Sequence, residues 1–278
     1  MIAASIVTYN TDSDELTTCL TCLSKCHQVL TIEIIDNSCS QETEKLIKDK
    51  FPQCNYIPCN NIGYGAANNI SIRHSFEKTE ELGLRYHLVL NSDVVFEPDV
   101  VTRLVERLES NTDIGLIMPS VTDINGSPQS CSHRLPTPYD LFMHRFAPHG
   151  FLKKWRRAYD ILPQRIGYDL NVPFMHGCFM LFTLEALNRI GLFDERYFLY
   201  LEDVDITRRV HRHYRTIVCH DILIRHMHRA DSRHNLRMMF IHAVNTLRYF
   251  SKWGYFFDSE RRKINKEFNR QLPERLLK

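Results

Sequence analysis

Hydrophobic and polar positions alternate in blocks over residues 1–120 of the chain. Short apolar runs, which fit buried strands, cover residues 2–7, 29–35, 56–57, 86–90 and 114–118. The segments between them place apolar residues three or four positions apart, which is the spacing of one helix face. Strands that alternate with helices in this way predict an α/β fold, in which a mostly parallel, Rossmann-like sheet carries helices on both faces.

Polar residues follow three of the predicted strands. They are Thr8-Tyr9-Asn10, Asp36-Asn37-Ser38 and Asn91-Ser92-Asp93. Asn, Ser and Asp are common in turns, so each of these tips taken alone could be a turn. The right-handed crossovers of a parallel sheet place the strand C-termini on one edge, where ligands bind in α/β proteins. Three polar tips on that edge therefore predict a ligand site.

The pattern changes after residue 120. Residues 122–165 are rich in Pro, His and Arg and lack a clear period. Strand character returns at residues 172–183, and an acidic run, Glu202-Asp203-Val204-Asp205, precedes another helix. From Arg233 onward the chain is helical, aromatic and basic. We expect a main domain over residues 1–230 and a helical extension over residues 231–278.

Composition narrows the class of protein. Of the 278 residues, 44% are hydrophobic and 24% are charged, as in an ordinary globular protein. The net charge of +2 predicts no nucleic-acid partner. Nine scattered cysteines without a secretory leader ahead of them predict free thiols in a cytoplasmic protein. Cys19, Cys22 and Cys26 share their segment with leucines at helical spacing, which favours a helix over a metal cluster. No apolar run approaches the ~18 residues of a membrane span.

Six motifs occur in an order that is typical of a known family. They are Ser5-Ile6-Val7-Thr8-Tyr9-Asn10, Asp36-Asn37-Ser38, Asn61-Ile62-Gly63-Tyr64-Gly65-Ala66-Ala67-Asn68, Leu90-Asn91-Ser92-Asp93, Gly177-Cys178-Phe179-Met180-Leu181, and Phe193-Asp194-Glu195 followed by Glu202-Asp203-Val204-Asp205. Each motif is weak alone, but the ordered set is specific. It resembles the family 2 glycosyltransferases with a GT-A fold, most closely the bacterial rhamnosyltransferase-like members that build cell-surface polysaccharides.

The resemblance implies an inverting glycosyltransferase that moves a sugar, such as rhamnose, from a UDP- or dTDP-sugar to a glycan or lipid-linked acceptor. It places the nucleotide-sugar at Thr8, Tyr9, Asn10, Asp36, Asn61, Gly63, Asn68, Asn91 and Ser92. Asp36 would accept the N3–H of uracil or thymine, because that imide donor lies between two carbonyls. Gly63 and Gly65 would let the backbone approach the donor.

The same resemblance implies a divalent metal, Mg²⁺ or Mn²⁺, that bridges the two phosphates of the leaving nucleoside diphosphate. Asp93 would bind this ion. Asn91 departs from the family, because an acid usually stands there in its Asp-x-Asp signature, and the lost carboxylate should weaken metal affinity. A histidine after an apolar strand would be the second ligand. We favour His226, and His228 is the alternative.

For catalysis, the resemblance implies that Glu202 and Asp203 form an acidic pair near the acceptor, with Asp203 as the general base. Inverting transfer needs a base that takes the proton of the acceptor hydroxyl on the face opposite the leaving diphosphate. The metal stabilises the charge that develops on that diphosphate. His176 and Gly177 are expected on the acceptor side.

Other interpretations compete with this one. The acids of the run 202–205 could simply cap the helix that follows. Asp203-Val204-Asp205-Ile206-Thr207 also fits the signature of phosphatases with an aspartyl nucleophile, but too little chain follows to supply their sheet. A sugar-nucleotide pyrophosphorylase needs a Gly-rich basic loop, which residues 5–10 do not form. A nucleotide-sugar-binding protein that has lost catalysis stays open because of Asn91.

Aromatic and basic residues interleave between Arg237 and Lys263. Residues 249–257 place several aromatic rings near Lys252, with Arg261-Arg262-Lys263 close behind. Aromatic rings and cations suit the headgroup region of an anionic bilayer. The segment therefore predicts peripheral contact with the cytoplasmic face of the inner membrane. The alternative is a helical lid that packs on the main domain.

Overall fold

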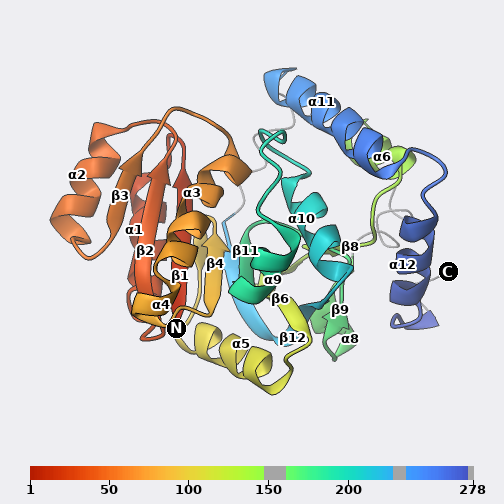
Figure 1. The fold of residues 1–278 in the computed structure, drawn as a ribbon, viewed down its shortest axis with the longest axis horizontal. Coiled ribbons are helices and arrows are strands. Elements are labelled where there is room, and N and C mark those ends of the chain that lie inside the picture. Colours follow the sequence, from red (N-terminus) through yellow and green to blue (C-terminus); the bar gives the residue numbers. More distant parts are fainter. Residues whose placement is uncertain (147–160, 228–235, 275–278) are drawn as a thin grey trace.

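The computed structural model describes residues 1–146, 161–227 and 236–274. One mixed sheet forms its centre, in the order β3-β2-β1-β4-β11-β6-β12-β5 (Figure 1). The strands of this sheet are β1 (Ile2–Thr8), β2 (Val29–Asp36), β3 (Asn55–Pro58), β4 (Tyr86–Leu90), β5 (Val94–Val95), β6 (Ile114–Thr122), β7 (Pro128–Gln129), β9 (Leu170–Asn171), β11 (Phe179–Thr183) and β12 (Arg215–His226). A separate pair consists of β8 (Ser132–His133) and β10 (Phe174–Met175).

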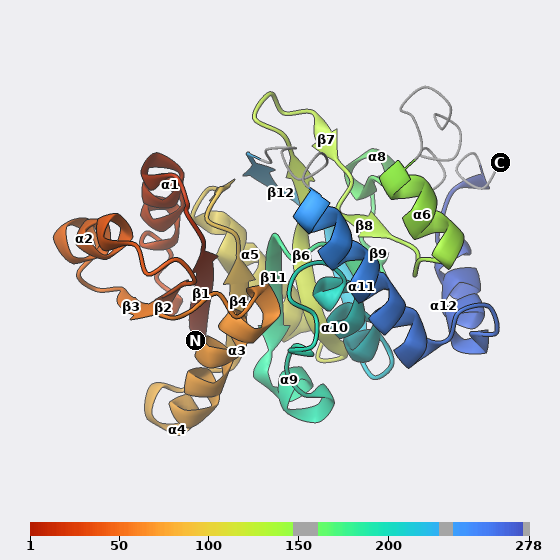
Figure 2. The ribbon, with the colours of Figure 1, turned by 90° about the horizontal axis from the view of Figure 1, so that it is seen from above.

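Helices lie on both faces of the sheet. They are α1 (Ser13–Leu23), α2 (Gln41–Lys50), α3 (Tyr64–Glu77), α4 (Thr79–Leu82), α5 (Asp99–Ser110), α6 (Pro138–Phe146), α8 (Pro163–Ile166), α9 (Leu184–Ile190), α10 (Glu202–His211), α11 (Leu236–Trp253) and α12 (Ser259–Asn269). Figure 2 shows α1 and α2 on one side of the sheet and α3, α4 and α9 on the other. The C-terminal helices α11 and α12 lie at the end of the molecule farthest from α2, together with α6 (Figures 1 and 2).

The parallel half of the sheet confirms the predicted α/β fold. β3, β2, β1 and β4 all run parallel, and their register aligns Thr8 with Asp36. Leu90, the last residue of β4, lies opposite Ile6. The three polar tips therefore meet at one edge of the sheet, as the sequence predicted.

The other half of the sheet was not predicted in this form. β11 runs antiparallel between β4 and β6, and β12 runs parallel to β6. The single strand expected over residues 172–183 is two strands, β10 and β11. Residues 176–178 between them do not pair with any strand of the main sheet. There the N–H of Gly177 donates to the side chain of Asp203 instead of to a strand. This break connects the sheet to the acidic run.

The apolar interior contains two clusters. The main cluster lies between the sheet and its helices and includes Cys19 on α1 and Cys26 just after it, so these cysteines are part of the core. All nine cysteines lie within the described ranges and are free thiols. We call the smaller group the second cluster; its buried members are Leu135, Leu141, Phe174, Tyr197, Leu201, Val204, Tyr249, Phe250 and Ile264. It joins α6, α11 and α12 to the chain around α10.

No helix among the described residues is long and apolar enough to span a bilayer. This agrees with the short apolar runs of the sequence.

A buried polar chain connects β4 to α3. His87 on β4 is completely buried, with Nε2 3.0 Å from the Ser5 hydroxyl and Nδ1 2.8 Å from the Ser75 hydroxyl. The Ser5 hydroxyl donates its only hydrogen to Asn68 (2.7 Å), so Nε2 of His87 donates to Ser5, and the Ser75 hydroxyl lies between Nδ1 and the carbonyl of Ser71, 3.0 Å away. Burial lowers the pKa of His87 to about 3, so the ring is neutral at ordinary pH.

This ring makes the stability depend on pH. The pKa of His87 is about 3 in the folded chain and 6.5 in a free side chain, so the unfolded state binds the extra proton between these values. The stabilising contribution of neutral His87 is fully present above pH 6.5 and is lost as the pH falls, by about 1.4 kcal/mol per pH unit. We expect His87→Gln, which retains a donor and an acceptor, to lower the free energy of unfolding at pH 7 by about 1–3 kcal/mol.

Urea denaturation at pH 7 and pH 5 checks this expectation. The difference between the wild type and His87→Gln should shrink at pH 5, because only the wild type loses the contribution of this histidine. A difference that stays constant between the two pH values would contradict a neutral buried His87.

Candidate active site

Asp36 lies at the edge of the sheet where the three polar strand tips meet, which we call the polar edge. It is on the side where the nucleotide-sugar donor was predicted. It is completely buried at the end of β2, and its carboxylate accepts hydrogen bonds from the hydroxyls of Thr8, Ser38 and Tyr56 and from the backbone N–H groups of Ser38 and Ser40. Burial alone would raise the pKa of Asp36, but the hydrogen bonds from Ser38, Tyr56 and Ser40 outweigh it and hold the pKa below its usual range. A pyrimidine imide would therefore compete with these internal donors for the carboxylate.

Tyr9, Asn10 and Asn61 are exposed beside Asp36. Asn10 adopts the left-handed conformation, with φ 50°, and its N–H lies 3.2 Å from the Ser38 hydroxyl oxygen that accepts from it. Asn61 Oδ1 accepts from the N–H of Gly63. The tips of β1 and β3 thus expose polar side chains at the position where a nucleotide was predicted.

Gly63 and Gly65 have a packing role that was not predicted from the sequence. A Cβ on Gly63 would lie 2.3 Å from the carbonyl oxygen of Phe198, and one on Gly65 would lie 3.0 Å from the Cβ of Phe193. The N–H of Tyr64 donates to the same Phe198 oxygen. These glycines therefore let the N-terminus of α3 touch residues 193–198, and their approach to the donor stays a prediction.

Asn68 is likewise turned into the protein. It is completely buried, its Oδ1 accepts from Ser5, and its Nδ2 donates to the carbonyl of Tyr64. Both ends of the amide are occupied, so Asn68 supports α3 from behind the polar edge. Its place in the nucleotide-sugar site stays a prediction.

Asp93 and His226 meet on neighbouring strands. Asp93 directly precedes β5, whose first residue, Val94, lies opposite His226 at the end of β12. The N–H of Met227 donates to the carbonyl of Asp93, and Oδ1 of Asp93 lies 3.2 Å from Nε2 of His226. His228 lies outside the described residues. Antiparallel pairing of β5 with β12 therefore brings together both residues that were predicted as metal ligands.

The spacing of this pair suits a divalent ion. Two ligands at right angles, each about 2.1 Å from the ion, are about 3 Å apart. Burial alone would lower the pKa of His226, but the hydrogen bond and charge of Asp93 outweigh it and raise the pKa to about 8. A proton thus sits where a cation would sit, and one carboxylate with one imidazole leaves coordination positions for diphosphate oxygens and water.

Tyr64 links the metal side to the acceptor side, a role that the sequence analysis missed. Its hydroxyl lies 3.0 Å from Asn91 Oδ1 and 2.8 Å from the carbonyl of Gly177. Asn91 Nδ2 lies 3.5 Å from Nε2 of His226. Asn91 stands where the family has its first acid, and its side chain lies between Tyr64 and His226. Ser92 is half-buried in the same turn. The position of Tyr64 between two packing glycines was the available signal.

An unusual backbone places the acidic pair. Tyr200 and Leu201 are consecutive non-glycine residues in the left-handed region, with φ 70° and 69°. Leu201 directly precedes α10, so Glu202 and Asp203 are the first two residues of that helix. Left-handed residues with a Cβ are strained and occur chiefly at functional sites. This turn aims both carboxyl groups toward Gly65 and Gly177, whose added Cβ atoms would lie 3.5 Å and 3.6 Å from the Cβ of Glu202 and Asp203, respectively.

The two carboxyl groups have different surroundings. Asp203 accepts from the N–H groups of Val204 (2.8 Å) and Gly177 (3.1 Å), whereas Glu202 Oε2 is buried without a hydrogen-bond partner among the described residues. Burial, followed by the charge of Asp203, raises the pKa of Glu202 well above its usual range. Burial also raises the pKa of Asp203, and His176 and the two N–H groups oppose that rise. The pair therefore keeps its negative charge on Asp203, with Glu202 protonated.

Two histidines flank Asp203. His176, predicted on the acceptor side, lies next to Gly177, and its Nε2 is 3.1 Å from Nε2 of His133. His133 is buried on β8, and the sequence offered no signal for it because it lies in the region without a clear period. The histidine pair brings β8 and β10 to the base.

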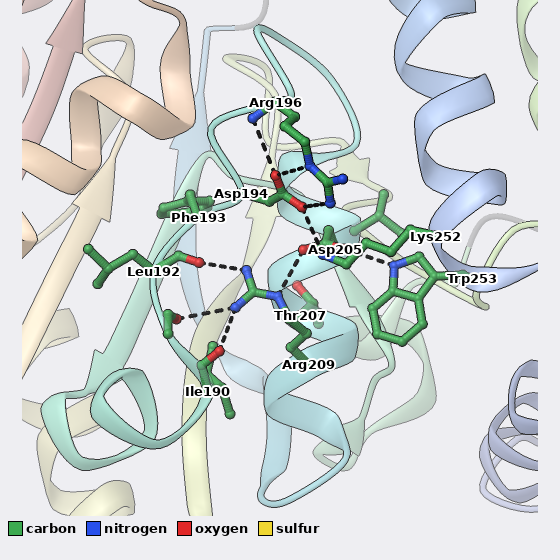
Figure 3. A network of polar contacts seen from close by, with 12 residues as sticks. Ile190, Leu192, Phe193, Asp194, Arg196, Asp205, Thr207, Arg209, Lys252 and Trp253 are labelled. Atoms are coloured by element: carbon green, nitrogen blue, oxygen red, sulfur yellow. Dashed lines mark hydrogen bonds and ion pairs between the residues drawn. The ribbon is translucent and has the colours of Figure 1, made fainter.

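Asp205 connects α10 to the C-terminal helices (Figure 3). It is completely buried and accepts from Trp253 Nε1 (2.8 Å), Lys252 Nζ (2.7 Å) and Arg209 Nε (2.8 Å). Arg209 also donates to the carbonyls of three residues at the end of α9, Ile190, Gly191 and Leu192. Lys252 bridges Asp205 to Asp194, 2.9 Å away. The acidic run therefore serves two purposes: its first half faces the site, and Asp205 fixes the helix to α9 and α11.

Arg208 makes a second buried connection. Its guanidinium pairs with Asp258 (2.7 Å) and Glu260 (2.8 Å) and lies 4.1 Å from the ring centroid of Trp253. Tyr249 and Phe250 are buried in the second cluster. The aromatic and basic residues 249–253, predicted to meet a membrane, thus pack largely against α10, which is the alternative lid interpretation.

Another acidic group lies elsewhere on β12. Asp169, His220 and Asp221 place their ligand atoms within 4.8 Å of one another. Arg107 pairs with both acids, and Arg103 pairs with Asp221. Because guanidinium groups already neutralise these carboxylates, we do not assign a metal to them.

The sequence profile described as Glycosyl transferase family 2 matches residues 4–191. The chain belongs to this family. It is 27% identical over 188 residues to N-acetylglucosaminyl-diphospho-decaprenol L-rhamnosyltransferase of Mycobacterium tuberculosis, which covers 65% of this chain and 61% of that protein. The chain therefore spans about three fifths of the length of this relative.

Solved structures show the same fold. Mannosyltransferase PcManGT from Pyrobaculum calidifontis, in complex with GDP-Man and Mn²⁺, superposes with a TM-score of 0.57 at 16% identity, over 89% of this chain and 64% of that one. GalNAc-T7 with UDP, GalNAc and Mn²⁺ gives a TM-score of 0.64 at 14% identity, over 91% of this chain and 48% of that one. The family 2 chain thus has a GT-A fold.

The connection between Asp205 and Trp253 can be tested by Trp253→Phe. This change retains an aromatic ring but removes the N–H, so buried Asp205 loses one of its three donors. We expect the free energy of unfolding to fall by about 1–3 kcal/mol, measured by urea denaturation. Tyr255→Phe, which removes a more exposed hydroxyl of the same segment, is the control and should change it by less than about 0.5 kcal/mol. Equal effects of the two changes would contradict the connection.

Proposed function

We propose that this family 2 glycosyltransferase transfers a hexose, such as rhamnose, with inversion from a UDP- or dTDP-sugar to a glycan or lipid-linked acceptor. The observation that carries the proposal is the buried pair Glu202–Asp203, which keeps its charge on Asp203 and lies across Tyr64 from Asp93 and His226. Base and cation site would thus lie on opposite sides of Tyr64, an arrangement that suits a single in-line displacement.

Asp203 acts as the general base. Its carboxylate is fixed by the N–H groups of Gly177 and Val204, so one oxygen lone pair stays directed at an acceptor hydroxyl. The raised pKa of Asp203 makes it a stronger proton acceptor than an ordinary aspartate. Protonated Glu202 adds no second negative charge beside the base.

Asp93 and His226 would hold Mg²⁺ or Mn²⁺. Such an ion supplies electrostatic stabilisation of the leaving diphosphate. Asn91 Oδ1 lies 3.0 Å from the Tyr64 hydroxyl at the place where a second acid would have bound the ion, so Asn91 supports Tyr64 beside the cation site. The GT-A relatives whose structures contain Mn²⁺ support a metal at this edge of the sheet.

The rhamnosyl donor and lipid-linked acceptor are supported by the printed name of the mycobacterial relative, which is a rhamnosyltransferase acting on a decaprenol-linked sugar. A pyrimidine base is supported by Thr8, Tyr9, Asn10 and Asp36 at adjoining strand tips. Peripheral contact with a membrane would follow from a lipid-linked acceptor.

A second candidate is a nucleotide-sugar-binding protein without catalysis, and Asn91 is the observation that favours it. Both candidates predict donor binding. Only the enzyme predicts turnover, so parallel measurements of donor binding and donor consumption separate them.

Asp203→Asn tests the base. The amide can retain the contact to Gly177 but cannot take a proton, so we expect the transfer rate to fall by about 10²–10⁴-fold with donor affinity unchanged. The rate of the wild type should also fall on acidification, as protonation of Asp203 begins at a higher pH than in an ordinary aspartate. Asp99→Asn, on the exposed surface of α5, is the control. Near-normal turnover of Asp203→Asn would remove Asp203 from this role.

Metal dependence is tested by calorimetry with UDP or dTDP in the presence of Mn²⁺. We expect binding that a chelator abolishes and that GDP reproduces only weakly. Asp93→Asn should lower Mn²⁺-dependent binding at least tenfold, because it removes the only carboxylate of the pair. Asp169→Asn, in the acidic group neutralised by Arg107, should leave it unchanged. Equal effects of the two substitutions, or binding that needs no metal, would contradict the assignment.

A further inference from the structure

The short connection between α11 and α12 displays aromatic side chains in a fixed loop. Gly254 starts this loop with φ 94°, and the buried side chain of Arg261 donates to the carbonyl of Tyr255 (2.8 Å). Arg262 donates to the carbonyl of Phe256 (3.1 Å). Phe256 is nevertheless 70% exposed and Phe257 92% exposed. The loop backbone is hydrogen-bonded into the protein while its two phenylalanines are directed outward.

An apolar stripe on α11 leads to this loop. Leu236, Phe240 and Leu247 are all exposed, and their spacing of four and seven residues places them on one helix face. The hydroxyl of Tyr255 donates to the carbonyl of Leu247, so the loop adjoins the end of the stripe. We call these three residues, together with Tyr255, Phe256 and Phe257, the apolar face. It lies on α11 opposite the residues that bind α10.

A cation-rimmed groove adjoins the apolar face. It has a volume of about 470 Å³ and is lined by Tyr139, Tyr255 and Phe256 together with Arg262 and Lys266. In the described ranges of the chain, neither Arg262 nor Lys266 forms an ion pair with a carboxylate. The groove thus combines aromatic walls with cations that are available to an external anion.

We propose that the apolar face and the adjoining groove bind the surface of an anionic lipid bilayer. The charge of Arg262 and Lys266 complements lipid phosphates, and the aromatic side chains suit the boundary between headgroups and acyl chains. An amphipathic helix with such a face lies in the plane of the interface. The inference rests on the proposed function, in which the acceptor is lipid-linked. It confines the membrane contact predicted between Arg237 and Lys263 to the apolar face and the groove, because residues 249–253 pack largely against α10.

The position of this surface relates it to catalysis. α11 bears the apolar face on one side and, through Trp253 and Lys252, binds Asp205 on the other. Asn245 of the same helix donates to the carbonyl of Leu199, just before the left-handed turn. Bilayer contact on α11 therefore places the acidic pair at a fixed orientation to the lipid surface that supplies the acceptor.

Co-sedimentation with vesicles tests the proposal. The probes are vesicles of phosphatidylcholine alone and of phosphatidylcholine mixed with phosphatidylglycerol. We expect the wild type to bind the anionic vesicles and to dissociate as salt is raised, because salt screens exposed charges. The double variant Phe256→Ser/Phe257→Ser should bind about tenfold more weakly or worse, and Lys266→Gln about fivefold more weakly.

Matched controls are Leu30→Ser, an exposed apolar residue at the start of β2, and Lys50→Gln, an exposed cation at the end of α2. Both should bind like the wild type, and circular dichroism should show all variants folded. The proposal is overturned if the double phenylalanine variant binds as well as the wild type. It is also overturned if vesicle charge has no effect, or if the apolar face instead joins two copies of the chain into a stable dimer.

Vesicle binding needs no donor, and hydrolysis of a nucleotide-sugar needs no vesicle. Donor turnover without vesicle binding would overturn the membrane surface alone. Vesicle binding without turnover or donor binding would overturn the proposed function alone.

Discussion

The left-handed turn at Tyr200 and Leu201 is the constraint on which the site depends. Each such residue costs about 1–2 kcal/mol, and that cost is borne only where surrounding contacts leave no alternative. Here the contacts come from three directions: Leu201 is buried in the second cluster, Asn245 donates to Leu199, and Gly63 touches Phe198. The position of the acidic pair is therefore determined by α3 and α11 as much as by its own loop.

Much of the fold follows from local pattern. Buried parallel strands read as continuous apolar runs, and their polar tips must share an edge, so the region around Asp36 and Asp93 was predictable. The positions of β11 and β12 in the sheet were not predictable, because the pairing of strands that are distant in the sequence does not change the hydrophobic pattern of either strand. The pairing of Asp93 with His226 could be anticipated only from the family resemblance, since 133 residues separate them in the sequence.

Residue type alone did not reveal the packing role of several positions. Gly63 and Asn68 have the composition of a ligand-binding turn, yet a close backbone contact and a buried amide explain them. The aromatic residues between Arg237 and Lys263 likewise have two roles: some are buried against α10 and others are exposed. Composition does not reveal which aromatic side chains pack against protein, so Trp253 on α11 and Phe257 in the following loop could be distinguished only by their contacts and exposure.

The antiparallel strand β11 has a consequence for how the chain is made. It covers the open edge of β4, but it begins at Phe179, whereas β4 ends at Leu90. A ribosome that adds about 5–20 residues per second leaves that edge uncovered for roughly 5–20 s. The exposed edge of such a strand is a template for pairing with other chains. The parallel half of the sheet, whose strands are the clearest in the sequence, thus stays incomplete until β11 is made, and over that interval the edge of β4 is open to pairing with other chains.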